Sequence, residues 1–399
     1  MTTKINNEHN KLNVPNLRFP EFQGEWEEHK LEDITAEIGD GIHATPIYDD
    51  NGTFYFVNGN NISEYGITIT ATTQKVTEEE ALRNNASALN SYSILLSING
   101  TVGNVALYKN ESIMLGKSAC YINVSSNINR NYIFYYLMMP KCQFYFTSEL
   151  TGTTIKNLSL KSIRKTKVLL PNANEQSKIA RLFDAINERI ATQNKIIEDL
   201  KKLKSAIIEI EYTPNTKTTS PIGDVIEQIS KRNKNNAIQN VLSVSNRQGF
   251  IKQSDQFENR NVASEDTSNY KIVEHNDFAF NPARINVGSI ARLTTFEKGI
   301  VSPMYICFRT QENVAPEYID YFFESKHFYC EIQKRLEGSV RQCLSFEGLC
   351  NIPLSLPSFE MQQLIGKRLF TLGQKIKTEI DLLELLNKQK QYLLRQMFI

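Results

Sequence analysis

The sequence lacks the residue patterns of common metal sites and of membrane-spanning helices. Its six cysteines contain no Cys-x-x-Cys pair and its five histidines no His-Glu-x-x-His, so no zinc site is expected. The longest apolar runs, such as residues 94–96, are far shorter than the ~18 residues of a membrane helix. The polar first residues also lack the apolar segment of a signal peptide. We therefore expect a soluble cytoplasmic protein with no metal and no membrane partner.

The sequence also lacks an excess of charge of one sign. It has 45 Lys and Arg against 44 Asp and Glu, a net charge of +1, so it cannot hold a polyanion through overall charge. A local basic face is still compatible with this balance. The 399 residues, 41% of them hydrophobic, predict two or three globular domains.

No catalytic motif is present. Gly116-Lys117-Ser118 resembles the end of a phosphate-binding loop, but the glycine required five residues earlier is Glu111. Asn281-Pro282 is followed by Ala283-Arg284, not by the aromatic residue with which amino-methyltransferases hold a flipped base. No dinucleotide-binding glycine motif, nucleophile elbow or kinase motif occurs. We expect a non-catalytic chain without a cofactor.

An internal repeat with an offset of 186 residues is the most informative feature that is present. Leu170-Pro171, Gln176 and Ile179 recur as Leu356-Pro357, Gln362 and Ile365. Similar matches extend over most of the two halves. A repeat this long predicts a duplicated domain with its own helix, because solenoid repeats are much shorter.

Each repeat ends in a predicted long helix, over 174–212 and 360–398, with an apolar residue every three or four positions. The pairing positions that we predict are Ile179, Phe183, Ile186, Ile190, Gln193, Ile197, Leu200, Ile365, Leu369, Leu372, Ile376, Glu379, Leu383 and Leu386. Two separate surface helices would also show such a stripe. Its narrowness over four heptads favours a coiled coil.

Antiparallel pairing of two equivalent helices creates a pseudo-two-fold axis near their middles. Gln193 and Glu379 interrupt the apolar stripe at equivalent positions. They either meet at this axis and fix the register of the pair, or are two tolerated polar substitutions.

The segments before the helices contain short β-type runs separated by Gly, Asn and Asp. One helix is expected over 130–150 and a counterpart over 316–336. The predicted fold class is α+β: two tandem β-rich globular units with a few helices, each followed by a long helix, the two helices pairing as an antiparallel coiled coil with pseudo-two-fold symmetry. The expected boundaries are a polar segment 1–19, a first globular domain 20–171, a helix 172–212, a linker 213–221, a second domain 222–357 and a helix 358–399.

Polar loops and basic residues are suited to reading a DNA duplex, where Arg, Asn and Gln recognise base edges and Lys and Arg contact phosphates. The first-half candidates are Asp40, His43, Thr45, Tyr48, Asn58, Asn60, Asn61, Lys156, Lys161, Arg164 and Lys165. The second-half candidates are Lys231, Arg232, Ser245, Asn246, Arg247, Arg284, Asn286, Arg341 and Gln342. The basic run 156–167 is either a phosphate-binding face or a solvated edge.

The sequence resembles the DNA-specificity (S) subunit of Type I restriction–modification systems over nearly its whole length. Its motifs carry this resemblance in both halves: residues 40–46 and 56–61, residues 241–245, 281–290 and 301–305, and the two Leu-Pro…Gln…Ile helix starts. The family usually has Glu before the Gln of the helix start. Glu175 keeps this pattern, but Met361 departs from it.

The resemblance implies that the two domains read the two halves of a split, asymmetric site in double-stranded DNA. It implies that the paired helices set the spacer and dock two methyltransferase (M) subunits, which restriction (R) subunits then join. This chain would itself be non-catalytic. The alternatives are a self-contained restriction–methylation enzyme, which would need the motifs that are missing, and a helical scaffold that binds protein partners only.

Overall fold

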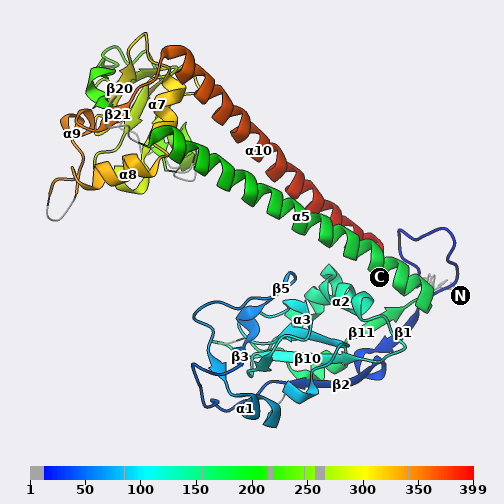
Figure 1. Ribbon diagram of the computed structural model, residues 1–399. Helices are drawn as coiled ribbons and strands as arrows, with labels where there is room; N and C mark the ends of the chain where they lie inside the picture. Colours follow the sequence, from blue (N-terminus) through cyan, green and yellow to red (C-terminus); the bar gives the residue numbers. More distant parts are fainter. Residues whose placement is uncertain are drawn as a thin grey trace, which may run out of the picture. The chain divides into compact units, whose positions relative to one another are not determined.

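The computed structural model describes residues 13–84, 86–154, 156–213, 219–246, 248–256, 266–338 and 342–399. The chain forms two compact units (Figure 1). Unit 1 comprises the residues up to Asn194 together with Leu382–Ile399, and unit 2 comprises Lys195–Asp381. Each long helix, α5 (Ala173–Tyr212) and α10 (Phe359–Gln396), therefore contributes one part to each unit.

Unit 1 is built on a four-stranded sheet in the order β2-β10-β7-β8. Its strands are β2 (Thr35–Asp40), β10 (Ala119–Val124), β7 (Ser93–Ser97) and β8 (Val105–Leu107). A second sheet has the order β6 (Lys75–Val76), β3 (Phe54–Val57) and β9 (Ile113–Leu115). The hairpin β4 (Ile62–Ser63)–β5 (Gly66–Ile67) and the pair β1 (Glu27–Lys30)–β11 (Lys167–Leu170) complete the strands. The helices are α1 (Glu78–Arg83), α2 (Arg130–Met138), α3 (Pro140–Ser148) and α4 (Leu160–Arg164).

The central strand β7 is buried on both faces, which explains its continuous apolar sequence. Ile94 and Leu96 pack in one cluster with Tyr132 of α2. Leu95 points to the opposite face and packs with Val57 of the second sheet. The central sheet is thus covered by helices on one side and by a second sheet on the other.

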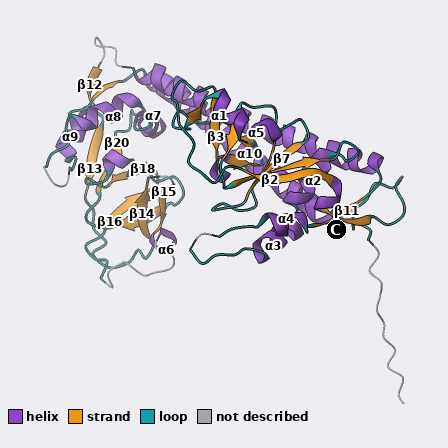
Figure 2. Cartoon of the chain, turned by 90° about the horizontal axis from the view of Figure 1, so that it is seen from below, coloured by secondary structure: helices purple, strands orange, loops and turns teal. Residues whose placement is uncertain are grey.

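Unit 2 repeats this arrangement. Its two four-stranded sheets have the orders β13-β20-β17-β18 and β15-β14-β19-β16, and β14, β15 and β16 are drawn in orange beside α6 in Figure 2. The strands are β12 (Thr219–Pro221), β13 (Ile226–Ile229), β14 (Val241–Ser245), β15 (Gly249–Lys252), β16 (Lys271–Glu274), β17 (Phe278–Phe280), β18 (Ile290–Arg292), β19 (Lys298–Val301), β20 (Ile306–Thr310) and β21 (Pro353–Ser355). The helices are α6 (Gln253–Gln256), α7 (Pro316–Phe322), α8 (Lys326–Gln333) and α9 (Phe346–Cys350).

The single helices predicted over 130–150 and 316–336 were wrong, because each is two helices. Between α2 and α3, Met139 has extended backbone (φ −64°, ψ 147°), as expected for a residue before proline. Between α7 and α8, Ser325 is also extended, and its hydroxyl accepts the backbone N–H of Phe328. A proline in one copy and a serine cap in the other interrupt the helix at equivalent places.

The internal repeat is visible in individual hydrogen bonds. The Gln176 side chain donates to the carbonyl of Pro171 at 2.8 Å and accepts the N–H of Asn129 at 3.0 Å. Gln362 makes the same two bonds. Its side chain donates to the carbonyl of Pro357 at 2.9 Å and accepts the N–H of Ala315 at 3.0 Å. Buried polar groups need such partners, so these glutamines fix how each long helix leaves its domain.

The two long helices are antiparallel, which confirms the predicted pairing. In unit 1, the ring of Phe183 near the start of α5 packs against the ring of Phe398, just past the end of α10. The ring centroids are 5.6 Å apart. In unit 2, Tyr212 at the end of α5 packs in one cluster with Ile365 and Leu369 near the start of α10. Every predicted pairing position is buried or half-buried. Gln193 and Glu379 are buried as well, and their meeting at the axis stays a prediction.

Candidate nucleic-acid interface

Unit 1 contains a groove of about 870 Å³ where five segments of the chain converge. They are the end of β2 with the loop that follows it, the turn at Asn60, the loop after β7, the turn between β9 and β10, and the stretch before α4. The lining residues are Asp40, His43, Asn60, Ile98, Asn99, Gly100, Thr101, Lys117, Ser118, Asn157, Leu158, Ser159 and Leu160. The groove thus contains three of the residues predicted from the sequence to contact DNA.

Close backbone contacts build one wall of the groove. The N–H of Gly41 donates to the carbonyl of Ala119 at 2.9 Å, and the N–H of Ile42 donates to Leu115 at 2.9 Å. A Cβ atom on Gly41 would lie only 2.2 Å from the carbonyl oxygen of Gly116. Only glycine fits there, so Gly41 allows the loop that carries His43 to leave β2 alongside this backbone.

A hydrogen bond orients the exposed imidazole of this loop. The Nε2 atom of His43 lies 2.8 Å from the Oδ2 atom of Asp40, and the His43 side chain is 73% exposed. In the same strand β2, Glu37 accepts a hydrogen bond of 2.8 Å from the hydroxyl of Tyr121. Burial, and then Glu37, raise the pKa of Tyr121 well above its ordinary range, so this hydroxyl stays a neutral donor and holds β2 in place.

The asparagines of the predicted site have different surroundings. Asn58 accepts the hydroxyl of Ser118 at 2.9 Å, and Asn61 donates its side chain to the carbonyl of Thr68 at 3.0 Å. These two amides brace the loop. Asn60 is exposed and lines the groove.

Two further candidates of this region, Thr45 and Tyr48, do not line the groove, although both are exposed. The ring of Tyr48 stacks edge-on against Phe56, with centroids 5.8 Å apart. Tyr48 therefore has a packing role in addition to any contact with DNA.

The basic residues before α5 fall into two groups, some exposed to solvent and others bonded to neighbouring residues. Lys156 and Lys161 are exposed and flank the groove-lining stretch 157–160 on both sides, and Lys165 is exposed as well. Arg164 instead donates to the carbonyl of Ile38 at 2.7 Å. Lys167 forms an ion pair of 2.8 Å with Glu28. Part of the run therefore makes structural contacts, and Lys156 and Lys161 are exposed beside the groove-lining stretch.

Unit 2 brings the equivalent loops together. The N–H of Leu344 donates to the carbonyl of Pro282 at 3.0 Å, as the N–H of Leu158 does to Ile98 at 2.9 Å in unit 1. Gly288 adopts a left-handed conformation (φ +87°), and a Cβ atom on it would lie 3.8 Å from the Cβ of Asn246. The loop containing Arg284 and Asn286 therefore lies beside Asn246.

The remaining candidates of unit 2 differ in exposure. Lys231, Arg232 and Gln342 are exposed, and Arg232 donates to the side chain of Asn269 at 3.1 Å. Ser245 is half-buried at the end of β14. Arg247 and Arg341 lie outside the described residues.

Sequence reasoning missed Asn99, Thr101, Lys117 and Ser159 as groove residues. Lys117 was considered only as part of a failed phosphate-binding motif. The available signal was the internal repeat, which aligns Val102-Gly103 with Val287-Gly288 and so relates the loop after β7 to the loop that carries Arg284 and Asn286.

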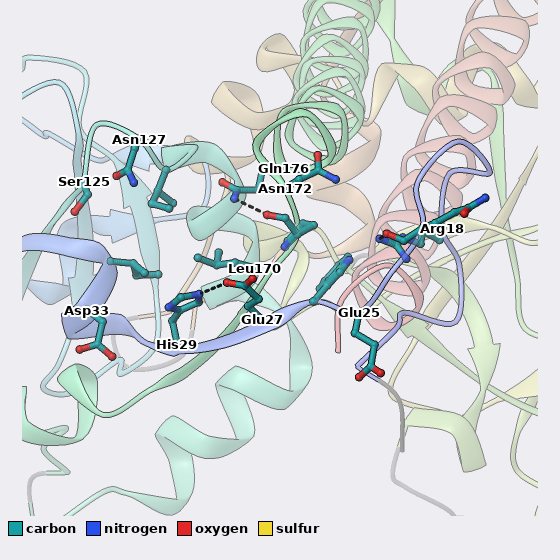
Figure 3. Close-up of a pocket in the computed structure, with 15 residues that line it drawn as sticks. Arg18, Glu25, Glu27, His29, Asp33, Ser125, Asn127, Leu170, Asn172 and Gln176 are labelled. Atoms are coloured by element: carbon teal, nitrogen blue, oxygen red, sulfur yellow. Dashed lines mark hydrogen bonds and ion pairs between the residues drawn. The ribbon is translucent and has the colours of Figure 1, made fainter. Parts of the chain in front are cut away.

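A second pocket of unit 1, of about 480 Å³, lies at the start of α5 (Figure 3). Glu27 and His29 point toward each other in this view, and the Nε2 atom of His29 lies 3.4 Å from the Oε2 atom of Glu27. Arg18 and Gln176 are also part of its lining. These side chains join the segment before β1 to the helix start. The pocket therefore marks a structural junction.

In the described part of the chain, no group of three or more His, Cys, Asp and Glu residues could hold a metal ion. The same part contains no helix that could span a membrane.

Comparison with known proteins gives one consistent family. The profile of the Type I restriction modification DNA specificity domain matches twice, over residues 23–202 and 214–388. The putative type I restriction enzyme MjaX specificity subunit of Methanocaldococcus jannaschii is 22% identical, with 95% of this chain and 92% of that protein covered. The MjaVIII specificity subunit of the same organism is also 22% identical, with coverage of 96% and 92%.

Solved structures share the fold. The S subunit of a Type-I restriction–modification system from M. genitalium superposes with a TM-score of 0.60 at 16% identity, covering 97% of this chain and 99% of that one. A chain from a structural study of the assembly of the type I R-M system gives a TM-score of 0.53 at 13% identity, covering 94% and 97%. With two profile matches over most of its length, this chain belongs to the DNA-specificity subunit family of Type I restriction–modification systems.

Proposed function

We propose that this chain recognises a split, asymmetric site in double-stranded DNA, with one recognition domain on each half-site. The observation that carries the proposal is the duplication itself. The two matches to a DNA-specificity domain correspond to two β-rich domains whose polar loops, after β7 and after β17, are held by equivalent backbone hydrogen bonds.

The groove of unit 1 supplies both kinds of contact that DNA recognition requires. His43, held by Asp40, and Asn60 present exposed donors and acceptors suited to base edges. Lys117, Lys156 and Lys161 are exposed cations next to these groups and are suited to the phosphates that position the protein. These groups are suited to binding DNA and to distinguishing one base sequence from another, and neither task requires catalysis by this chain.

The long helices suit the task of setting the distance between half-sites. The 40 residues of α5 correspond to ~60 Å at 1.5 Å per residue, and half-sites one helical turn apart are separated by ~34 Å. We propose that the helices also dock two methyltransferase subunits, that restriction subunits join this complex, and that methyl transfer and cleavage belong to those partners.

Co-expression with a candidate methyltransferase subunit, followed by mapping of methylated bases in genomic DNA, tests this proposal. We expect a split adenine motif that appears only when this chain is present. Methylation of the same motif without the chain would contradict the proposal. A continuous motif without a spacer would also contradict it.

Groove variants sharpen the test. His43→Ala with Asn60→Ala should change or relax one half of the motif and leave the other half intact, with a loss of ~1–3 kcal/mol of discrimination for each good base contact. Ile47→Ala is the matched control, because Ile47 is exposed on the same loop but does not line the groove. An unchanged motif in the double variant would show that His43 and Asn60 do not read bases.

Substitutions at the flanking lysines should behave differently. Lys156→Ala with Lys161→Ala should weaken binding to all sequences and reduce the slope of log affinity against log salt by about two, since each phosphate contact contributes ~0.9. Lys167→Ala is the control, because Lys167 is paired with Glu28. DNA-binding isotherms recorded from about 50 to about 200 mM salt, where phosphate contacts strongly affect affinity, would measure this slope. A changed sequence preference would mean that these lysines read bases.

A further inference from the structure

A lysine at the same place in each long helix forms an ion pair with the domain of the other repeat. The offset of 186 residues relates Lys204 on α5 to Lys390 on α10. Lys390 belongs to unit 1 and Lys204 to unit 2. Helix α10 of the second repeat therefore contacts the first recognition domain through Lys390, and α5 of the first repeat contacts the second domain through Lys204.

In unit 1 the partner of this lysine lies at the tip of a hairpin. The Nζ atom of Lys390 donates to the Oε2 atom of Glu64 at 2.5 Å, and the two residues are 326 positions apart in the chain. The Lys390 side chain is 3% exposed, and a buried ammonium requires a partner of opposite charge. Glu64, between β4 and β5, provides this partner. The tip of the hairpin β4–β5 is therefore fixed on α10.

The same hairpin is joined at its base to the groove of unit 1. The backbone N–H of Thr68, just after β5, donates to the carbonyl of Asn61 at 2.7 Å. The Asn61 side chain donates back to the carbonyl of Thr68 at 3.0 Å. Asn60, which lines the groove, immediately precedes this base. The hairpin thus connects Lys390 at its tip to a candidate base-reading residue at its base.

Unit 2 has an equivalent support from α5. The Nζ atom of Lys204 donates to both carboxylate oxygens of Glu324, at 2.7 and 3.0 Å, and Glu324 lies directly before α8. Helix α8 packs against the turn Ile285–Val287, which contains Asn286 and follows Arg284. In both units a lysine from the helix of the other repeat therefore holds an element that supports a polar recognition loop.

We propose that Lys390 and Lys204 are positioning residues for base recognition, and that each holds the recognition loop of the domain that belongs to the other repeat. The inference rests on the proposed function, which supplies DNA as the ligand of these loops. A binding side chain is effective only when it is held within ~0.5 Å of its productive position. A hairpin fixed at its tip and at its base meets this requirement better than one fixed at its base alone, so Lys390 acts on base recognition through Asn60.

The test measures base discrimination by the full chain in complex with its methyltransferase subunit. The probes are a DNA duplex with the mapped motif and duplexes with one substituted base pair in one half of it. Discrimination is the ratio of their dissociation constants. The half-site of unit 1 is the half that changes when His43 and Asn60 are replaced by alanine.

We expect the effects of the two lysines to be separate. Lys390→Met removes the charge and keeps an unbranched side chain of similar length. It should lower discrimination in the half-site of unit 1 at least about threefold, a part of the roughly tenfold or more that one good base contact provides. Discrimination in the other half-site should stay unchanged. Lys204→Met should have the opposite distribution.

Controls separate positioning from folding. Lys388→Ala removes a surface lysine of the same helix, which pairs with Glu384, and should leave discrimination unchanged. Lys390→Arg keeps the charge and should retain discrimination. In the Asn60→Ala background, Lys390→Met should cause no further loss, because the two residues act on the same base contact. A general loss of stability would instead weaken binding to all duplexes alike.

A second variant tests the same contact from the hairpin. Glu64→Gln removes the charge of a side chain that is 31% exposed, and it decides the question if Lys390→Met folds poorly. We expect the same loss of discrimination in the half-site of unit 1 as for Lys390→Met.

The outcomes distinguish this inference from the proposed function. Undiminished discrimination in a folded Lys390→Met or Glu64→Gln variant would overturn the inference and leave the proposed function intact. So would equal losses in both half-sites, or additive losses when Lys390→Met is combined with Asn60→Ala. A wild-type complex that does not distinguish the mapped motif from its variants would overturn the proposed function, and the inference with it.

Discussion

At the scale of single residues, the pair between Arg18 and Glu175 joins the segment before β1 to the first turn of α5. The Glu175 side chain is fully buried and the Arg18 side chain is 13% exposed. Removing one partner leaves a buried charge without its counter-charge, which costs ~3–5 kcal/mol. Arg18→Ala should therefore lower the free energy of unfolding by about that amount in urea titrations.

A surface pair provides the comparison for this prediction. The Lys167 and Glu28 side chains are 73% and 49% exposed, and exposed pairs contribute ~0–1 kcal/mol. Lys167→Ala should thus have little effect on the same measurement. Equal effects of the two substitutions would mean that the segment before β1, residues 13–26, does not stabilise unit 1 through Arg18.

A second residue-scale prediction concerns pH. Burial raises the pKa of Asp320 in α7 to about 6, against the attraction of Arg292, whose Nε lies 3.2 Å from the Asp320 carboxylate. The pKa of an unfolded aspartate is ~3.9, so the folded state binds this proton more tightly. The contribution of Asp320 to stability is therefore complete below about pH 4. It is lost as the pH rises through 6.

Unfolding midpoints in denaturant, measured from pH 4 to pH 7 (roughly the window between the two pKa values), would reveal this effect. The wild-type chain should lose stability across the window, and Asp320→Asn should lose less. Identical pH profiles for the two proteins would show that Asp320 does not titrate in this range.

At the scale of elements, the long helices carry the length on which the spacer depends. Four residues inserted after Gln193 and four after Glu379 keep the two helices matched and lengthen each by ~6 Å. An insertion of this size is a stutter that a coiled coil can absorb. We expect the unspecified spacer of the methylated motif to grow by about two base pairs, at ~3.4 Å each.

The control for this prediction is an insertion in one helix only. That change shifts one helix along the other and should destabilise the pair without giving a defined longer spacer. An unchanged spacer in the double insertion would show that the helices do not set the distance between half-sites.

At the scale of the whole molecule, each recognition domain is enclosed by a pair of strands, β1 with β11 and β12 with β21. Exchange of residues 27–170 for the matching part of another specificity subunit keeps the segment before β1 and both long helices intact. We expect methylation mapping to show a change in only one half of the motif. The reciprocal exchange of residues 219–355 should change the other half. A change in both halves after either exchange would contradict the modular arrangement.

The sequence by itself determined the features that repeat or follow a helical period. The 186-residue offset predicted two related units, and the apolar stripe from Ile179 to Leu200 predicted a long helix that pairs with its counterpart. These features depend on local periodicity, which is fully present in the residues. The division of α2 from α3 was missed, because a proline can begin a helix as well as end one.

Only the tertiary structure decided which polar residues share a surface. Asp40, Asn60, Lys117 and Asn157 line one groove although they come from four separate parts of the chain. The sequence could not distinguish Arg164, which holds the carbonyl of Ile38, from its exposed neighbours. The cover of Glu175 by Arg18, 157 residues away, was equally hidden. Such contacts join residues that are distant in sequence, so only packing of the folded chain selects them from the many pairs of matching charge.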